Sequence, residues 1–440
     1  SPEAHVSAAD GVVTMNPISG TFRHPAGGAT AATLSEFLSS TKETEELFMV
    51  VDEELKMMAA VCADGGRITG PHLKEMSRLT HTEYMLSGRS TMDPRDILRE
   101  TMFAPTVTGS PMQNACAVIE RHERTPRGYY SGVAALFTPR PDGGHDLDAP
   151  ILIRTAYLVD GRLRVPVGAT LVRHSDPDGE VSETHGKAAG VLGAIGAIER
   201  DSATPDDEDD DAPAAAPLRL ADDPAIAAQL ASRNARLASF WLEPQSDVPG
   251  PFAGRSAVIV DAEDRFTTML AHQLRHLGFE VTAAHWSDDI DVSAADVLVS
   301  GPGPGDPRDV TSERIVRMRE LVDARLAAGL PLLAVCLSHQ ILADRLGLDL
   351  AALEAPHQGL QKTVDVFGFP ASIGFYNTFT ARVAPGTTSH GAADVAADAA
   401  SGDVYALRGP RFSSIQGHLE SILSRDGYQT LQRLIAHALV

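Results

Sequence analysis

Cysteine is scarce in this chain of 440 residues, which contains only Cys62, Cys116 and Cys336. Three cysteines so far apart cannot build the disulfide framework that stabilises small secreted domains. Long apolar runs are also missing, because no stretch of about 20 residues could cross a bilayer as a helix. The first residues lack the charged start and apolar segment of a signal peptide. We therefore expect a protein of the reducing cytoplasm that does not enter a membrane.

Positive charge is in short supply as well. The chain has 37 lysine and arginine residues against 59 aspartate and glutamate residues, a formal net charge of −22. Proteins that bind nucleic acid need basic surfaces for phosphate contacts, so this balance argues against such a partner. Much of the excess lies in one acidic run at residues 206–211, and such runs are usually solvated linkers.

Composition divides the chain into three parts. Residues 201–250 contain an acidic, Ala- and Pro-rich segment at 203–216, followed by a predicted helix from Pro224 to Leu242. Residues 251–440 alternate strand and helix patterns, which predicts an α/β domain whose mostly parallel sheet carries helices on both faces. The first of these elements are a strand at 257–260, a helix at 266–277 and a strand at 280–282.

Strand and helix patterns cluster in residues 1–200 rather than alternating, so we predict an α+β domain there. The predicted helices are 30–38, 45–63, 94–102 and 111–121, and the predicted strands are 128–138, 151–159 and 162–165.

Cys336 stands where an apolar strand pattern gives way to a helical pattern. A thiol on such a turn lies at a helix N-terminus, where the helix dipole favours the reactive thiolate. Downstream, His418 can take the thiol proton and Glu420 can orient the imidazole. Upstream, the Gly- and Pro-rich segment 301–307 follows another strand pattern and leaves backbone N–H groups free to hold an oxyanion.

These three motifs, in this order, resemble the class I glutamine amidotransferases over residues 255–440. The resemblance implies hydrolysis of L-glutamine through a glutamyl thioester, with Cys336 as nucleophile, His418 as base and Glu420 as its orienter. The residues implied to contact the glutamine or the oxyanion are Gly303, Gly305, Gln340, Asn377 and Thr378. The family usually has an aromatic residue before the histidine. Here Gly417 stands there, and its backbone freedom is expected to loosen the aim of the base.

Two acidic residues of the N-terminal part suggest a metal site. Glu46 and Glu183 lie in distant segments, and a helix would place Glu183 on one face with Lys187. Mg²⁺ is held by a few carboxylates together with substrate oxygens. Two such glutamates can therefore hold one Mg²⁺ against a substrate that carries a carboxylate.

The strings around these residues resemble the chorismate-utilising enzymes, such as anthranilate synthase and isochorismate synthase. The resemblance implies that Glu46 and Glu183 hold Mg²⁺, which clamps the ring carboxylate of chorismate. His81 would act beside the departing C4 hydroxyl as a general acid or polarising group. The residues implied to contact chorismate are Thr108, Tyr130, Arg154, Gly168, Ala169 and Lys187. The strings that carry the resemblance are 17–21, 79–84, 106–111, 127–132, 153–155 and 167–172.

The expected architecture is thus part of an α+β chorismate-binding domain joined to an α/β glutamine amidotransferase domain. The strings at 51–56, 81–86 and 168–175 favour the phenazine-type 2-amino-2-deoxyisochorismate synthases within the family. Ammonia released from glutamine would be channelled to C2 of chorismate, with loss of the C4 hydroxyl. Two alternatives stay open: an anthranilate synthase, which also eliminates pyruvate, and a chain in which only the glutaminase half turns over.

The start of the chain departs from the family. The chorismate domain normally begins well before the string at 17–21, and here sixteen residues precede Pro17. We expect this chain to need that missing N-terminal segment as a partner to make product. The phenazine-type relatives also imply a homodimer.

Overall fold

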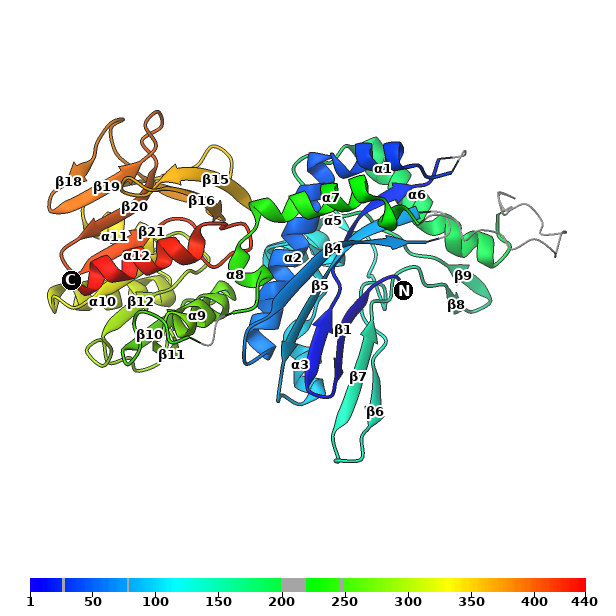
Figure 1. Ribbon diagram of the computed structural model, residues 1–440, viewed down its shortest axis with the longest axis horizontal. Coiled ribbons are helices and arrows are strands. Elements are labelled where there is room, and N and C mark those ends of the chain that lie inside the picture. Colours follow the sequence, from blue (N-terminus) through cyan, green and yellow to red (C-terminus); the bar gives the residue numbers. More distant parts are fainter. Residues whose placement is uncertain (26–27, 77–78, 199–218, 246–247) are drawn as a thin grey trace. The chain divides into compact units, whose positions relative to one another are not determined.

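The computed structural model describes residues 1–25, 28–76, 79–198, 219–245 and 248–440. Within them the chain forms two compact units, Ser1–Ala235 and Arg236–Val440 (Figure 1). The acidic run at 206–211 and the linker expected at 203–216 lie outside the described residues. No helix among the described residues combines the length and apolar character that crossing a bilayer requires.

The first unit is built on an antiparallel sheet of seven strands, in the order β3-β5-β2-β1-β7-β6, with β4 paired to β5. A separate short hairpin joins β8 to β9. The strands are β1 (Ala4–Ala9), β2 (Val12–Met15), β3 (Ile18–Arg23), β4 (Arg67–Glu75), β5 (Leu79–Arg89), β6 (Leu136–Pro139), β7 (His145–Pro150), β8 (Tyr157–Val159) and β9 (Arg162–Arg164).

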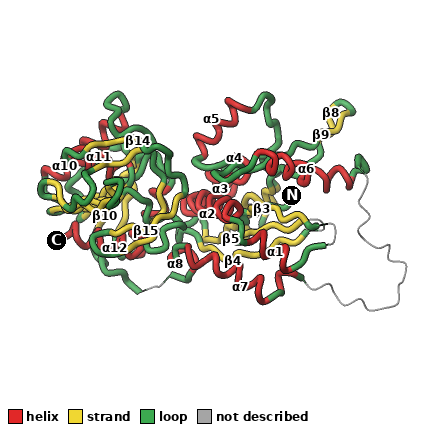
Figure 2. The backbone as a smooth tube through the Cα atoms, turned by 90° about the horizontal axis from the view of Figure 1, so that it is seen from above, coloured by secondary structure: helices red, strands yellow, loops and turns green. Residues whose placement is uncertain are grey.

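Helices cover this sheet, and Figure 2 shows the strands between α2 and α7. Helix α2 packs against β3 and β5, and α7 packs against β4 and α1. Phe22, Leu34 and Ile226 are buried together at the second of these contacts. The unit is therefore α+β, as expected. Its helices are α1 (Ala31–Leu38), α2 (Thr41–Val61), α3 (Pro94–Thr101), α4 (Pro105–Thr108), α5 (Met112–His122), α6 (Pro177–Ala194), η1 (Leu220–Asp222) and α7 (Pro224–Arg233).

The four helices predicted in residues 1–200 are present as α1, α2, α3 and α5. Two of the predicted strands are wrong over most of their length. Residues 128–135 and 151–156 are mainly turns and irregular chain, because φ is positive at Gly128 (63°), Ser131 (65°) and Arg154 (51°). A residue in that region cannot continue an extended strand.

The predicted single helix from Pro224 to Leu242 is also wrong. Helix α7 ends at Arg233, and the chain continues through the turn η2 (Asn234–Arg236) to the short helix α8 (Ser239–Leu242). The Asn234 side chain accepts a hydrogen bond from Tyr84 Oη at 2.8 Å and donates to the Gly70 carbonyl at 2.7 Å. These contacts tie the end of α7 to the first unit.

The second unit holds an eight-stranded sheet in the order β11-β10-β12-β13-β21-β20-β19-β18. The five strands from β11 to β21 are parallel, and the last three join antiparallel. Two further antiparallel pairs are β14–β17 and β15–β16. The strands are β10 (Ser256–Asp261), β11 (Glu280–His285), β12 (Val297–Ser300), β13 (Leu332–Val335), β14 (Asp349–Ala352), β15 (Leu360–Asp365), β16 (Pro370–Phe375), β17 (Phe379–Arg382), β18 (Ser389–His390), β19 (Ala393–Ala397), β20 (Val404–Gly409) and β21 (Phe412–Ile415).

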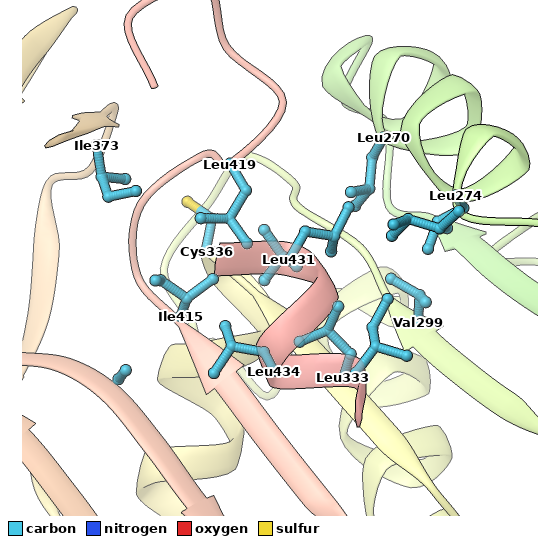
Figure 3. Close-up of a cluster of buried hydrophobic side chains, with 14 of the residues drawn as sticks. Leu270, Leu274, Val299, Leu333, Cys336, Ile373, Ile415, Leu419, Leu431 and Leu434 are labelled. Carbon is cyan, nitrogen blue, oxygen red and sulfur yellow. The ribbon is translucent and has the colours of Figure 1, made fainter. Parts of the chain in front are cut away.

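Helices lie on both faces of this sheet, as expected for the α/β domain. Alternate residues of β13 point to opposite sides: Leu333 packs with α9 and α12 (Figure 3), and Leu332 packs with α10 and α11. The strand is therefore apolar on both faces, as buried parallel strands are. The helices are α9 (Phe266–His276), α10 (Glu313–Ala327), α11 (Leu337–Arg345) and α12 (Gly427–Leu439).

Candidate active sites

Cys336 connects β13 to α11 and has a strained backbone. Its φ of 52° and ψ of −104° lie outside the regions that non-glycine residues normally adopt. Its N–H donates to the Ile415 carbonyl of β21 at 2.9 Å, which fixes the turn. The sulfur lies 4.0 Å from the Tyr376 carbonyl oxygen. The turn therefore presents the thiol at the N-terminus of α11.

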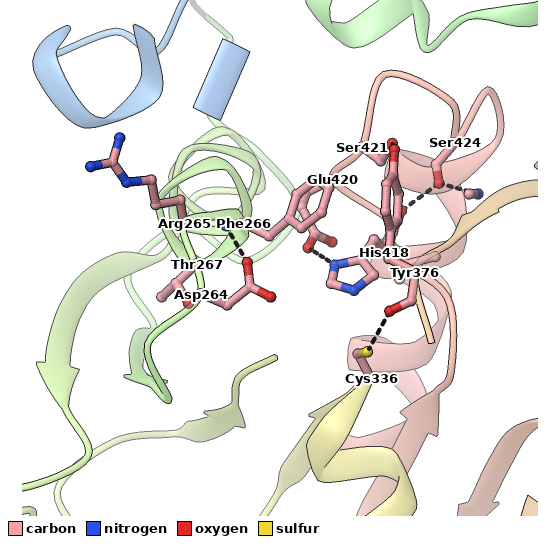
Figure 4. A network of polar contacts seen from close by, with 12 residues as sticks. Asp264, Arg265, Phe266, Thr267, Cys336, Tyr376, His418, Glu420, Ser421 and Ser424 are labelled. Carbon is pink, nitrogen blue, oxygen red and sulfur yellow. Dashed lines mark hydrogen bonds and ion pairs between the residues drawn. The ribbon is translucent and has the colours of Figure 1, made fainter. Parts of the chain in front are cut away.

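His418 and Glu420 lie beside this thiol (Figure 4). His418 Nδ1 is 2.9 Å from Glu420 Oε1, and both side chains are almost completely buried. Burial alone lowers the pKa of His418, but the Cys336 sulfur and the Glu420 carboxylate outweigh it and raise this pKa well above its usual value. The arrangement favours an imidazolium beside the sulfur, the form in which a Cys–His pair is nucleophilic. The three residues predicted to act together are thus neighbours.

The Gly- and Pro-rich segment packs against the same turn. A side chain on Gly303 would come within 2.5 Å of the Ala262 carbonyl oxygen and 2.9 Å of Leu337 Cδ2, so only glycine fits. Gly305 has a φ of 111°, which glycine adopts without strain. Arg314 of α10 donates to the Pro304 carbonyl at 2.9 Å and holds the segment in place.

Two of the three residues expected to bind glutamine are buried near this turn. Gln340 Nε2 donates to the Phe379 carbonyl at 2.7 Å and to Gln416 Oε1 at 3.0 Å. Asn377 Nδ2 donates to the same Phe379 carbonyl at 2.9 Å. Thr378 is exposed. Because the Gln340 and Asn377 amides already bond within the fold, their contact with glutamine stays a prediction.

The expectation that Gly417 loosens the histidine is wrong. A side chain at Gly417 would lie 2.4 Å from Ile373 Cγ2, so glycine provides necessary room. The His418 N–H donates to the Gly374 carbonyl at 2.8 Å, and these two residues form a β-bridge. The Phe266 ring lies 4.2 Å from the imidazole, centroid to centroid. The base is therefore held firmly by its neighbours.

The first unit contains a cavity of about 370 Å³, a volume that suits a small-molecule ligand. Thr108 and Glu183 are not on its wall. The Thr108 hydroxyl instead donates to the Ala104 carbonyl at 2.8 Å, so its contact with chorismate stays a prediction. The predicted site residues that do line the cavity are Glu46, His81, Tyr130, Arg154, Gly168, Ala169 and Lys187.

Cationic side chains and a phenol share this wall. Lys187 Nζ lies 2.6 Å from Glu183 Oε1 and 3.2 Å from the Gly168 carbonyl oxygen. A side chain on Gly168 would lie 2.6 Å from the Tyr130 hydroxyl, so this glycine admits a close approach by Tyr130. With Arg154 beside them, these groups can bind a ligand with carboxylates.

His81 faces this cavity in its neutral form. Its Nδ1 lies 2.6 Å from the Gly20 carbonyl oxygen. A carbonyl can only accept, so Nδ1 carries the proton. Burial lowers the pKa of His81 to about 4. The ring is therefore neutral near pH 7, and Nε2 offers a lone pair rather than a proton, which disfavours the expected role as general acid.

Four glutamates surround the ammonium group of Lys42. Glu43 and Glu46 come from α2, and Glu180 and Glu183 from α6; Lys42 Nζ lies 3.3, 3.5, 3.1 and 3.5 Å from one oxygen of each, in that order. No three His, Cys, Asp or Glu side chains are preassembled as a metal-binding group within the described ranges. Carboxylate oxygens that already converge on a cation nevertheless fit the Mg²⁺ that the resemblance implies.

Several of these residues were missed from the sequence. Glu43 and Glu180 each precede a predicted metal ligand by three residues, and this helical spacing is the signal that would have found them. Glu3, which lines the cavity, has no comparable signal. It is 1% exposed and accepts a hydrogen bond from Thr106 Oγ1 at 3.0 Å. Burial raises the pKa of Glu3 to about 8, so it is mostly protonated near pH 7.

Comparison with known proteins places both units in families. Residues 1–193 match the family described as chorismate binding enzyme, and residues 258–438 match the class-I glutamine amidotransferases. The whole chain is 46% identical to a protein of Pseudomonas fluorescens named "Anthranilate synthase, phenazine specific", of which it covers 68%. It is 33% identical to an anthranilate synthase of Azospirillum brasilense, over 97% of this chain and 54% of that protein.

Solved structures match single units. Anthranilate synthase component I from Streptococcus pneumoniae is 30% identical over 43% of this chain and 42% of that chain, with a TM-score of 0.37. A GMP synthase-type protein from Thermoplasma acidophilum is 19% identical over 42% of this chain and 94% of that chain, with a TM-score of 0.35. The full-length similarity and the two family matches agree with the two sites. The chain therefore belongs to the family of glutamine-dependent chorismate-aminating synthases in which a chorismate-binding enzyme is fused to a class I glutamine amidotransferase, and it is similar to the phenazine-specific anthranilate synthases.

Proposed function

We propose that this chain converts chorismate into 2-amino-2-deoxyisochorismate with nitrogen from glutamine. The observation that carries the proposal is the cavity of the first unit, where Arg154 and Lys187 lie with the protonated acid Glu3. This cavity and the Cys336–His418 pair belong to the same chain. The similarity to proteins named phenazine specific supports this product.

In the glutaminase step, Cys336 Sγ attacks the γ-amide carbon of glutamine. Backbone N–H groups near Gly303 and at the N-terminus of α11 stabilise the oxyanion. The protonated His418 gives its proton to the departing nitrogen, so neutral ammonia leaves and a glutamyl thioester remains. Water then attacks the thioester carbon, His418 takes its proton, and glutamate leaves as the sulfur is released.

In the synthase step, Arg154 and Lys187 pair with the carboxylates of chorismate. The nitrogen lone pair of ammonia forms the bond at C2, the two conjugated ring double bonds both shift, and the C4–O bond breaks so that the hydroxyl leaves as water with a proton from Glu3. Neutral His81 is placed to accept the proton that the added nitrogen gives up. Glu46 and Glu183 would hold Mg²⁺, which when bound would supply positive charge for a ring carboxylate. Chorismate and ammonia thus give 2-amino-2-deoxyisochorismate and water.

We also propose that ammonia passes from one site to the other without mixing with the solvent. Ammonium is not a nucleophile, so release at neutral pH would waste most of the nitrogen. With ¹⁵N-amide glutamine and excess unlabelled ammonium, the product should retain the label. A product that carries the isotope ratio of the solution would contradict the channel.

Product identity is the main test. Purified chain, chorismate, glutamine and Mg²⁺ should give an aminated product that retains the enolpyruvyl group in its mass spectrum. The alternative is an anthranilate synthase, the activity that the names of the relatives include. Release of pyruvate with anthranilate would establish that alternative, and glutamine hydrolysis without any amination would overturn both. The homodimer and the need for a preceding segment stay predictions from the resemblance.

Metal removal tests the assignment of the ligands. Wild-type synthase activity should vanish with a chelator and return with added Mg²⁺. Glu183→Ala should lower activity strongly and should no longer respond to Mg²⁺ in the concentration range that restores the wild type. A variant with a wild-type Mg²⁺ response would show that Glu183 is not a ligand.

A further inference from the structure

We propose that Lys42 is an internal counter-cation that occupies the metal position and must leave when Mg²⁺ binds. This inference rests on the proposed magnesium role of the glutamates. It goes further, because it assigns a task to Lys42 of α2. The ammonium group of Lys42 holds these four carboxylates together until Mg²⁺ binds.

The distances distinguish Lys42 from an ordinary ion pair. Its Nζ lies between 3.1 and 3.5 Å from all four carboxylates, without one dominant partner. Lys187 and Lys74, in contrast, each have one close carboxylate, at 2.6 and 3.0 Å. The ammonium of Lys42 therefore sits among the four glutamates as a shared cation.

Charge explains why a cation is needed there. The four carboxylates contribute at most −4, and Lys42 and Lys187 contribute +2, so negative charge is in excess. Side-chain exposure is between 7 and 14% for these glutamates. Like charges repel strongly where water is largely excluded. Without Lys42 the N-terminal ends of α2 and α6, which carry these glutamates, would repel each other unless another cation took its place.

Geometry explains why Mg²⁺ and Lys42 cannot share this place. Magnesium binds oxygens at about 2.0–2.1 Å, so the proposed ligands Glu46 and Glu183, which now stand 3.5 Å from Nζ, must close in by about 1.5 Å. Glu43 lies so close to Gly20 that an added Cβ there would come within 2.5 Å of Glu43 Oε2, so this carboxylate has little room to move back on that side. Lys42 can move out instead, since its side chain is 19% exposed and flexible.

Displacement predicts a change in metal affinity. If Lys42 fills the site about nine-tenths of the time, its removal strengthens apparent Mg²⁺ binding about tenfold. Lys42→Met should show this gain in isothermal titration with Mg²⁺ alone. Lys42→Arg keeps the competing charge and should not. Lys187→Met is the matched control, because it removes one positive charge beside a single glutamate and should give a clearly smaller gain.

A second measurement needs no variant. Lysine acylation of the full wild-type chain, followed by mass spectrometry, should proceed up to about tenfold faster at Lys42 with saturating Mg²⁺ than without it. Lys362 of the second unit serves as the internal reference and should not respond. Unchanged Lys42 acylation, with Mg²⁺ binding verified by titration, would overturn the displacement and leave the proposed function intact. Absence of Mg²⁺ binding in every variant would overturn the metal assignment itself.

Discussion

Glu3→Gln is the substitution that tests the electrostatics of the chorismate cavity most directly. The pKa of Glu3 rises from 4.5 to about 8 because the carboxyl is buried. In the unfolded chain this group loses its proton above about pH 4.5, whereas the folded protein keeps it until about pH 8. Stability therefore falls as pH rises through this window, by several kcal/mol at about 1.4 kcal/mol per pKa unit. Glutamine does not ionise, and its Oε1 can still accept from Thr106 Oγ1.

Denaturant unfolding at pH 5.0, 6.5 and 8.0 measures the effect. The free energy of unfolding of the first unit should fall by several kcal/mol more in the wild type than in Glu3→Gln. If the free energy of unfolding changed with pH in the same way in both proteins, the assignment of Glu3 as a buried, protonated acid would be refuted. Wild-type synthase activity at a fixed concentration of free ammonia should also fall above about pH 8, where the acid form is lost.

The same variant tests the proposed catalytic role. Positioned acids contribute about 10²–10⁴-fold, so ammonium-dependent synthase activity of Glu3→Gln should fall at least 100-fold. Glutamine hydrolysis, which takes place at Cys336, should be unaffected and shows that the protein is folded. Full synthase activity in Glu3→Gln would show that another group donates the proton to the C4 hydroxyl.

Three further substitutions probe the other groups. Cys336→Ala should abolish glutamine-dependent product formation but keep turnover with added ammonium; loss of both would contradict the division of labour. Glu420→Gln removes a carboxylate that raises the pKa of His418. The alkaline limb of the pH–rate profile of glutamine hydrolysis should therefore move to lower pH, and kcat should fall about 10²-fold. An unchanged profile would contradict the pairing of His418 with Glu420. Gly168→Ala places a methyl 2.6 Å from the Tyr130 hydroxyl, and the KM for chorismate should rise about tenfold. Tyr130→Phe in the Gly168→Ala background should recover part of it unless the clash lies elsewhere.

The second unit was the easier one to predict because its signals are local. A buried parallel strand such as β13 is a continuous apolar run, and the helix after Cys336 follows at once. In the first unit the predicted strands at 128–138 and 151–159 failed. Ser131 and Arg154 there adopt positive φ values, which depend on the fold around the cavity rather than on local preference.

Contacts between distant segments explain the rest of the difference. The role of Lys42 as a shared cation cannot be predicted from its neighbours in sequence, because Glu180 and Glu183 of α6 reach it from about 140 positions along the chain. Glu3 becomes an acid only through burial, which its neighbours in sequence do not reveal. The expectation for Gly417 is wrong for the same reason. Its contact with Ile373 comes from the distant strand β16, which the local sequence does not reveal.

Burial lowers the pKa of the histidine in both sites, but the final protonation states are opposite and fit the two steps. At His418 the sulfur and the carboxylate outweigh desolvation, so the imidazole is charged and can give a proton to the departing nitrogen. At His81 nothing outweighs desolvation, and the ring stays neutral. A charged imidazole there would protonate arriving ammonia and destroy the nucleophile, whereas a neutral one leaves its lone pair free. The proton for the C4 hydroxyl must then come from a separate acid. Apart from Glu46, the proposed metal ligand, Glu3 is the acid on the cavity wall whose raised pKa suits that task.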